Sequence, residues 1–355
     1  LPETELYGKT GIQKQIFNTV YQLMAVKQQT PELLQQAKTL LMLPDYFGFR
    51  LTGNKLSEYT NGSTTQLVNP DTFQWDKELI RKLGYPEDIF LPLQMPGTKV
   101  GQLLPEIQKE VGFDLEVVLC GSHDTASAVM AVPQTEGDGI YISSGTWSLM
   151  GIESLKPVIT EDAAAANFTN EGGYDHRFRF LKNIMGLWMI QSVRHEYNDA
   201  YSFAQLCNMA EESKEFPSRV DVNDQSFLSP DSMVEAIRQY CHKTGQPVPE
   251  SVGELTSVVY RSLAQSYGET VRGLEKIAGK TYDSIHIIGG GSNAAYLNQL
   301  TADATGKTVY AGPGEATAIG NLLAQMIHAG DLADLKSARK CVRESFEIKT
   351  FAPAK

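Results

Sequence analysis

Leu119-Cys-Gly-Ser-His-Asp-Thr-Ala-Ser-Ala128 is the stretch that decides the fold of this chain. The residues just before it, Leu115-Glu-Val-Val-Leu119, predict a short buried strand. Gly121 and Ser122 end that strand, and the small residues from Ala126 to Ala131 predict a helix. A strand that passes through a tight turn into a helix is a place where α/β folds bind ligands. The stretch therefore predicts an α/β domain with a site at this turn.

Three polar side chains follow each other in the turn, namely His123, Asp124 and Thr125. An aspartate is favoured at any helix start, because its oxygen accepts a backbone N–H and its charge complements the helix dipole. That explanation accounts for Asp124. It does not account for His123 beside it, nor for the glycine- and hydroxyl-rich turn at Ser143-Ser-Gly-Thr146.

Length and composition bound the class of protein. With 355 residues the chain is expected to form two domains. Its net charge of −11 argues against nucleic-acid or membrane-surface binding, but not against a small anion in a local pocket. The four cysteines form no C-x-x-C pair, so neither a zinc site nor a disulfide scaffold is indicated, and a reduced cytoplasmic protein is predicted. The sequence contains no run of eighteen apolar residues, so it indicates no membrane-spanning helix.

The first part of the chain reads as helical. Apolar residues from Ile12 to Met24 fall on one helical face, and Thr30-Pro31-Glu32 is typical of the start of a second helix that continues to Leu41. Pro44 is expected to end it. The polar stretch Ser57–Thr65 is expected to be a surface or cleft loop.

The Pro- and Gly-rich segment Val132–Gly139 is the best candidate for an interdomain hinge. After it, Ile140–Gly151 predicts two strands joined by Ser143–Thr146, a turn that can direct N–H groups and a hydroxyl at an anion. An ordinary hairpin turn explains the same residues equally well. A further strand at Arg177–Leu181 is expected to end at Lys182-Asn183.

A helix is expected to begin at Ile184, and the spacing of Trp188 within it indicates a core residue. Ser251-x-x-Glu254 is a capping box that predicts a long helix ending at Gly279. Ser284–Leu300 then reads as a strand, three glycines and a helix, and Lys307–Ala311 as one more strand.

The turn Gly289-x-Gly291-x-x-Ala294 matches the dinucleotide-binding fingerprint in its G/A form. However, no acidic residue stands at the tip of the next strand to hold a ribose, and Glu315 lies inside the following glycine loop. A nicotinamide-dependent dehydrogenase is therefore disfavoured. The P-loop, H-E-x-x-H and G-x-S-x-G motifs are absent.

Taken together, these elements resemble the FGGY family of carbohydrate kinases, and the similarity runs over nearly the whole chain. The matching segments occur in the family's order and are Gly121–Val129, Ser143–Gly151, Thr169–Gly173, Leu181–Trp188 and Ile287–Ser292. The resemblance implies an α/β, actin-like and ribonuclease-H-like fold of two domains with ATP in the cleft between them. It assigns residues 1–134 to the sugar-binding domain, 135–345 to the nucleotide-binding domain and 346–355 to a tail.

Family members begin with a strand and a glycine-rich hairpin that carries an aspartate for phosphate and metal. No such segment precedes Leu1. The resemblance therefore implies a kinase without its N-terminal segment, whose first domain is incomplete and whose activity as this chain alone is in question.

The resemblance also implies roles for individual residues. Asp124 is expected to be the general base that takes a proton from the sugar's 1-hydroxyl. His123 and Thr125 are expected to bind sugar hydroxyls, although His123 has an alternative role as a supporting residue. The remaining positions with implied roles are Asn183 for the sugar, and Gln191, Gly145, Thr146, Gly289, Gly290 and Gly291 for ATP. Asn183 and Gln191 have an alternative as helix-capping amides.

The expected reaction is the ATP-dependent phosphorylation of L-rhamnulose to its 1-phosphate in L-rhamnose degradation. L-Fuculose or another ketose is the nearest alternative substrate, and an inactive ligand-binding fragment is the alternative from another class. Mg²⁺ is expected to accompany ATP, bound mainly through phosphates and water, with no protein ligand named. The chain is expected to be a monomer or a weak homo-oligomer. The role of Cys120 stays open, a small buried hydrophobe being the simplest.

Overall fold

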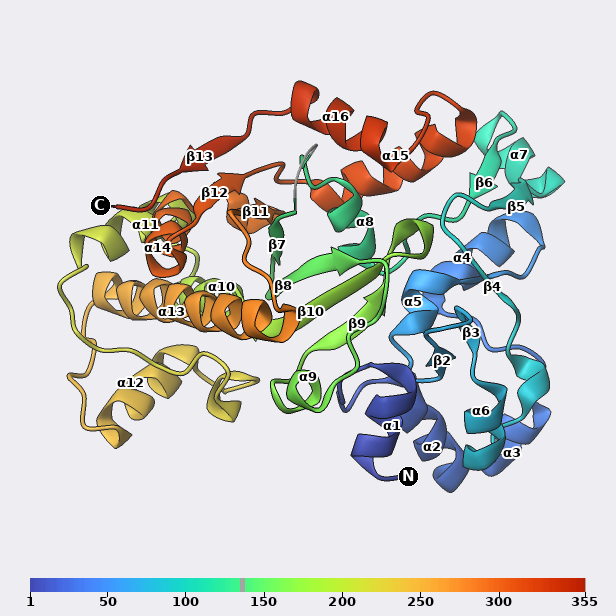
Figure 1. Ribbon diagram of the computed structural model, residues 1–355, viewed down its shortest axis with the longest axis horizontal. Helices are drawn as coiled ribbons and strands as arrows, with labels where there is room; N and C mark the ends of the chain where they lie inside the picture. The colour runs from blue at the N-terminus through green and yellow to red at the C-terminus, as the bar shows by residue number, and fades with distance from the viewer. Residues whose placement is uncertain (135–137, 355) are drawn as a thin grey trace. The chain divides into compact units, whose positions relative to one another are not determined.

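The computed structural model describes residues 1–134 and 138–354 (Figure 1). They form two compact units, each assembled from separate segments. Unit 1 comprises 1–131, 153–181 and 317–338, and unit 2 comprises 132–152, 182–316 and 339–355. Of the expected hinge at 132–139, residues 135–137 lie outside the described part. No helix among the described residues is long and apolar enough to cross a membrane.

Unit 1 is built from short helices and paired strands. Its helices are α1 Glu3–Thr10, α2 Thr19–Gln29, α3 Pro31–Gln36, α4 Leu43–Thr52, α5 Tyr59–Ser63, α6 Lys77–Leu83, α7 Pro105–Val111, α8 Asp124–Met130 and α9 Glu161–Ala165, with 3₁₀ turns at Glu87–Ile89 and Tyr174–His176. Its strands pair as β1 Ser57–Glu58 with β4 Leu93–Gln94, β2 Val68–Asn69 with β3 Gln74–Trp75, and β5 Lys99–Gln102 with β6 Glu116–Val118. A buried cluster that includes Tyr59, Leu67, Leu79 and Ile80 forms a core.

Several elements continue from one unit into the other. They are β8 Trp147–Ser154, β10 Phe178–Met185, α15 Ala316–Ala329 and α16 Leu335–Ser345. Within unit 1, β10 pairs antiparallel with β9 Thr169–Gly172, and Arg179 stands opposite Glu171 in the register.

Unit 2 contains a mixed sheet in which β13 Lys349–Phe351, β12 Thr308–Ala311, β11 Ser284–Ile288, β7 Ile140–Ser144 and β8 lie side by side in that order. β7, β11 and β12 are parallel, whereas β8 and β13 run antiparallel to their neighbours. The carboxyl ends of the three parallel strands therefore meet at one edge. That edge is where open α/β sheets bind ligands.

The helices of unit 2 are α10 Trp188–Glu196, α11 Phe203–Glu212, α12 Met233–Lys243, α13 Val252–Ala278 and α14 Ala295–Thr305, with 3₁₀ turns at Gln225–Phe227 and Gly290–Asn293. The long helix α13 packs against α11 and α14 (Figure 1). Its predicted capping box is confirmed, since Ser251 Oγ accepts from Glu254 N and Glu254 Oε2 accepts from Ser251 N. Gly279, at φ 63°, ends the helix as predicted.

The helix predicted from Ile12 to Met24 is wrong in its first half. Gly11, at φ 67°, ends α1, and α2 begins at Thr19. Side chains satisfy the backbone between them, because Gln66 Nε2 donates to Ile12 O and Asn18 Nδ2 donates to Gln13 O. Side-chain hydrogen bonds thus replace helical ones, and Ile16 is left 80% exposed.

Two further predictions in this unit are corrected. The second helix, α3, ends at Gln36, and Pro44 starts α4 within its first turn instead of ending a helix. A proline is tolerated there because the first-turn N–H groups have no helical partner. The stretch 57–65 is not a surface loop: it contains β1 and α5, and Glu58, Tyr59 and Thr60 are buried.

Candidate functional site

The predicted turn places Asp124 at the first position of helix α8. Strand β6 leads into it, but it is confined to Glu116–Val118 and is half-buried, whereas a buried strand was predicted. Leu119 is fixed by a hydrogen bond from its N–H to Thr98 O (2.8 Å). His123 caps the helix, since its carbonyl accepts from Ala126 N (2.8 Å). The rest of α8 is buried from Thr125 to Met130. A buried helix therefore carries Asp124 at its first position.

The Asp124 carboxylate is held in place but remains open to solvent. Its side chain is 79% exposed. Oδ1 accepts from Thr125 N at 2.6 Å and from Thr125 Oγ1 at 3.3 Å. Thr125 itself is buried, so in this structure its hydroxyl orients Asp124.

Glu58 holds this turn through hydrogen bonds to Ser122. The sequence analysis did not predict this role. Its buried carboxylate accepts from Ser122 Oγ (2.6 Å) and Ser122 N (3.2 Å). It also accepts from Thr60 N, Thr60 Oγ1 and Asn61 N, at 2.6, 2.7 and 3.0 Å. Burial raises the pKa of Glu58, and these hydrogen bonds oppose that shift. Glu58 therefore joins the start of α5 to the residues before Asp124.

His123 sits beside Asp124 with its ring against buried charges. Its Nδ1 lies 3.3 Å from Arg179 NH2 and 3.8 Å from Asp124 Oδ1, and its Nε2 lies 3.8 Å from Glu171 Oε2. Burial, and then the charge of Arg179, lower the pKa of His123. The lowered pKa and the guanidinium donor at Nδ1 both favour the uncharged ring. Its side chain is 23% exposed.

Cys120, just before the turn, has a thiol whose pKa is raised by burial and then by the charge of Glu58. Such a thiol is a poor nucleophile. All four cysteines lie in the described part of the chain and are free.

In unit 2, the turn between β7 and β8 carries Gly145 and Thr146. Gly145 O accepts from Leu187 N (3.0 Å) and Thr146 O accepts from Trp188 N (3.1 Å). Gly186 permits this approach, because a Cβ there would lie 2.7 Å from Thr146 O. The predicted hairpin is confirmed, and Thr146 is exposed at its tip.

The glycine turn after β11 packs against that hairpin. Gly289 has φ 84°, and its N–H donates to Pro313 O (3.0 Å). A Cβ at Gly291 would lie 2.0 Å from Ser144 Oγ, whereas a Cβ at Gly290 would meet nothing within 4 Å. The turns after β7, β11 and β12 thus meet at the carboxyl edge of the parallel strands, with Gly290 leaving open space.

Asn183 and Gln191 lie on neighbouring elements of unit 2. Asn183 is inside β10, which continues to Met185 instead of ending at Lys182-Asn183 as predicted. The helix begins at Trp188, not at Ile184, and Gln191 lies in its first turn. Trp188 is 36% exposed, so its assignment to the core is wrong. Ile184 is buried within β10, so the helix begins only after that strand has ended.

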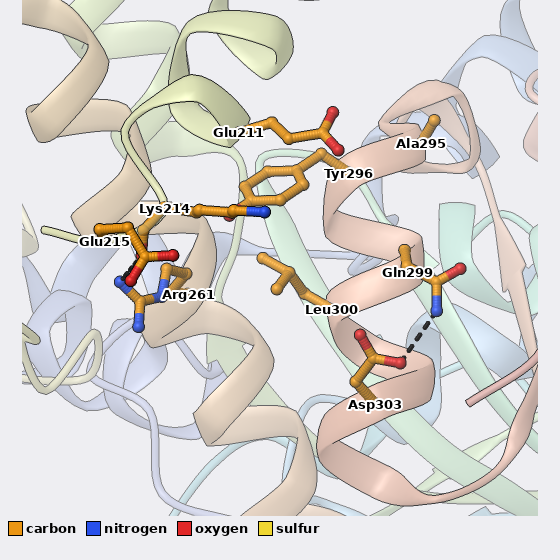
Figure 2. Close-up of a pocket in the computed structure, with 9 residues that line it drawn as sticks. All are labelled: Glu211, Lys214, Glu215, Arg261, Ala295, Tyr296, Gln299, Leu300 and Asp303. Atoms are coloured by element: carbon orange, nitrogen blue, oxygen red, sulfur yellow. Dashed lines mark hydrogen bonds between the residues drawn. The ribbon is translucent and has the colours of Figure 1, made fainter. Parts of the chain in front are cut away.

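A groove of about 510 Å³ lies elsewhere in unit 2, between α11, α13 and α14. Figure 2 shows its lining, in which Gln299 Nε2 donates to Asp303 Oδ1 (2.9 Å) on one side and Arg261 lies on the other. Its charged side chains are of both signs, and none of the sequence-predicted site residues lines it.

Residues 140–329 match the C-terminal domain, and residues 1–131 the N-terminal domain, of the FGGY family of carbohydrate kinases. The chain belongs to this family. FGGY relatives are similar over almost all of it. The rhamnulokinase of Halalkalibacterium halodurans is 52% identical over 349 residues, which cover 98% of this chain and 74% of that protein. The rhamnulokinase of Bacillus subtilis is 46% identical, covering 99% of this chain and 72% of that protein.

Solved structures with the same fold include other sugar kinases. Ligand-bound xylulose kinase from Lactobacillus acidophilus aligns with a TM-score of 0.76 at 17% identity, covering 99% of this chain and 71% of that one. Plasmodium falciparum glycerol kinase with ADP aligns with a TM-score of 0.75 at 15% identity, covering 99% and 71%. The predicted α/β fold of the FGGY sugar kinases is confirmed.

Sequence reasoning missed Glu58, Glu171, Arg179 and Gly186. Arg179 stands between two buried phenylalanines in Arg177-Phe-Arg-Phe180, and strand alternation would place it on the solvent side. The local pattern therefore gave no signal that Arg179 is buried. Glu58 carried none, because its partner Ser122 is distant in the sequence.

Proposed function

We propose that this chain carries the sugar-binding turn and the nucleotide-binding turns of an ATP-dependent kinase that converts L-rhamnulose to L-rhamnulose 1-phosphate. The observation that carries the proposal is the exposed, oriented Asp124 carboxylate at the start of a buried helix, beside the imidazole of His123. Family membership supports the reaction class. The sugar follows from rhamnulokinase relatives at up to 52% identity.

In the proposed reaction Asp124 accepts the proton of the sugar's 1-hydroxyl as that oxygen attacks the γ-phosphorus of ATP. The new oxygen–phosphorus bond forms while the bond from the γ-phosphorus to the β,γ-bridging oxygen breaks, and ADP leaves. Phosphoryl transfer has a loose transition state, so positioning and charge neutralisation dominate. The two hydrogen bonds from Thr125 to Asp124 Oδ1 support such positioning.

Unit 2 supplies the proposed ATP contacts. Thr146, with Gly145 beside it, would contact the ATP phosphates from the β7–β8 turn, and the open backbone at Gly290 would lie against adenosine. Gln191 would contact the nucleotide, and Asn183 the sugar. Their positions on α10 and β10 are compatible with these roles, which stay proposals.

We propose Mg²⁺ as the companion of ATP. No cluster of three or more His, Cys, Asp or Glu side chains that could hold a metal occurs among the residues that the structure describes. A nucleotide-bound Mg²⁺ needs few protein ligands, because phosphates and water complete its octahedral shell. The ion would neutralise phosphate charge when bound.

A coupled assay of ADP release tests the proposal with L-rhamnulose, L-fuculose and D-xylulose. It uses this chain and a version extended to the full length of the Halalkalibacterium halodurans relative, because the chain covers 74% of that protein. We expect turnover on L-rhamnulose that falls at least a hundredfold in Asp124→Asn. Preference for another ketose would change the substrate, and turnover unaffected by Asp124→Asn would remove the proposed base.

Because the reaction consumes ATP, we also propose a cytoplasmic site of action. The expected monomer or weak homo-oligomer stays a prediction, which sedimentation velocity measures directly.

A further inference from the structure

A fully buried arginine lies behind the candidate site. Arg179 is 0% exposed, and its cross-strand partner in the β9–β10 register is Glu171. Its Nε donates to Gly172 O at 3.0 Å. Its NH2 lies 3.1 Å from Glu171 Oε2 and 3.3 Å from His123 Nδ1. A single guanidinium nitrogen therefore faces both the carboxylate of β9 and the imidazole next to Asp124.

We propose that Arg179, held by Glu171, fixes His123 as the neutral tautomer with its proton on Nε2, so that the ring donates a hydrogen bond to an oxygen of the sugar bound at Asp124. Arg179 and Glu171 are then positioning residues that act through His123. The part of this inference that concerns the sugar rests on the proposed function; the part that concerns the tautomer does not.

The tautomer follows from donor and acceptor chemistry. A guanidinium has donors and no acceptor, so an imidazole nitrogen within hydrogen-bond distance of it must offer a lone pair. That nitrogen is Nδ1, which leaves the proton on Nε2. The distance of 3.8 Å from Nε2 to Glu171 Oε2 is too long for a hydrogen bond, and within the described part of the chain Nε2 has no other partner. The Nε2–H is therefore available to a ligand.

The same arrangement keeps His123 from competing for Asp124. Nδ1 lies 3.8 Å from Asp124 Oδ1, so a proton on Nδ1 would give the ring a donor next to that carboxylate. With its lone pair turned to Arg179, Nδ1 has no proton to give. The charged groups that face the ring are Arg179 on β10, Glu171 on β9 and Asp124 on α8. Asp124 thus stays available to accept the sugar's proton.

Stability alone does not account for this pair. Burying an ion pair costs desolvation that its attraction often fails to recover. In addition, Arg179 NH1 has no hydrogen-bond partner among the described residues. A position that leaves a buried donor unpaired while fixing a site residue fits a functional constraint.

Nitrogen-15 NMR of histidine-labelled protein tests the tautomer on this chain without any substrate. Loss of one ring signal in His123→Gln assigns the resonance. We expect a neutral ring protonated at Nε2 in the wild type at pH 7, and a mixture of tautomers in Arg179→Gln. Glu171→Gln, which keeps the size of the side chain, should shift the ring toward the same mixture. Arg238→Lys, at a surface ion pair on α12, is the matched control and should leave the signal unchanged.

Kinetics on the extended protein give the second readout. We expect the sugar KM to rise about tenfold in Arg179→Lys and Glu171→Gln, the size of one lost hydrogen bond, with the ATP KM unchanged. In Arg179→Gln, which removes the positive charge beside the ring, kcat should also fall as the pH is lowered through the ordinary histidine range, because a protonated His123 would then pair with Asp124.

A wild-type ring protonated at Nδ1, or a tautomer that does not change in Arg179→Gln and Glu171→Gln, would overturn the inference. An equal rise in the KM of sugar and ATP would also overturn it, because it would indicate general loosening. If Arg179→Gln does not fold, Glu171→Gln decides the outcome. Absence of ketose turnover in the wild type would instead contradict the proposed function and leave the NMR result intact.

Discussion

The Ser122 hydroxyl donates a 2.6 Å hydrogen bond to the buried carboxylate of Glu58, 64 residues earlier in the chain. The same carboxylate accepts from the backbone N–H groups of Thr60 and Asn61 at the start of α5. One side chain therefore fixes both the first turn of α5 and the turn that presents Asp124. Glu58 therefore holds the residues that precede Asp124 in place.

Replacing Glu58 by glutamine is expected to destabilise the protein by about 3 kcal/mol. The carboxylate accepts five hydrogen bonds, and an amide would place its NH₂ group against backbone N–H donors. Urea unfolding monitored by circular dichroism measures the loss. Glu344→Gln, at an exposed ion pair with Lys340, is the control and should change stability by less than about 0.5 kcal/mol. Equal effects at the two positions would contradict the anchoring role of Glu58.

Asp45 is expected to make the protein less stable as the pH rises. Burial, and then the charge of Glu58, raise the pKa of its carboxyl from 3.8 to about 7. Between these values the folded state binds more protons than the unfolded state, so the free energy of unfolding falls with increasing pH. Asp45→Asn should therefore gain stability relative to the wild type between pH 4 and 7. Urea titrations at four pH values test this, with the exposed Asp88→Asn as control; a difference that is constant with pH would refute it.

His286 is expected to make the protein less stable as the pH falls. It is buried on β11, stacked on Tyr310 at 5.2 Å, and burial followed by the charges of Arg343 and Arg339 lowers its pKa from 6.5 to about 4. Between pH 4 and 6.5 the unfolded state therefore binds more protons than the folded state. The contribution of His286 to the free energy of unfolding is complete above pH 6.5 and is lost as the pH falls toward 4. In His286→Phe, which keeps an aromatic ring, thermal denaturation should show a shallower loss of stability in acid. The same substitution at exposed His242 should retain the wild-type slope.

Gly290 and Gly291 form a matched pair in the glycine turn. Gly291→Ala would place a Cβ 2.0 Å from Ser144 Oγ and is expected to cost about 1–3 kcal/mol of stability by overpacking. Gly290→Ala meets nothing within 4 Å and should leave the unfolding free energy within about 0.5 kcal/mol. If adenosine lies on Gly290 as proposed, calorimetry should nevertheless show weaker ATP binding in Gly290→Ala. Wild-type ATP affinity in that variant would exclude the contact.

Local signals in the sequence were enough for the elements that frame the candidate site. The turn into α8, the hairpin at Ser143–Thr146, the capping box at Ser251 and the glycine turn at Gly289 all occur as predicted. Each depends on neighbouring residues, such as a cap, a small-residue turn or an alternating strand. Physical chemistry within a few residues decides such features.

Features that depend on partners distant in the chain could not be predicted from the sequence. Ile12–Asn18 is not helical because Gln66 and residues on β9 satisfy its backbone, and Trp188 is exposed because β10 extends farther than its local pattern predicts. Arg179 is buried where alternation would expose it, because Glu171 compensates its charge and His123 Nδ1 accepts from its guanidinium. Tertiary partners overrode local preference at each of these positions.

By itself the sequence determined the α/β class, the kinase family and the turn that carries Asp124, because strands, turns and helix starts are written in contiguous residues. Tertiary structure alone decided that Glu58 holds Ser122, that Arg179 faces His123, and that Gly291 packs on Ser144. The physical reason is that hydrogen bonds, burial and close contacts join residues brought together by folding. No local pattern encodes those pairs.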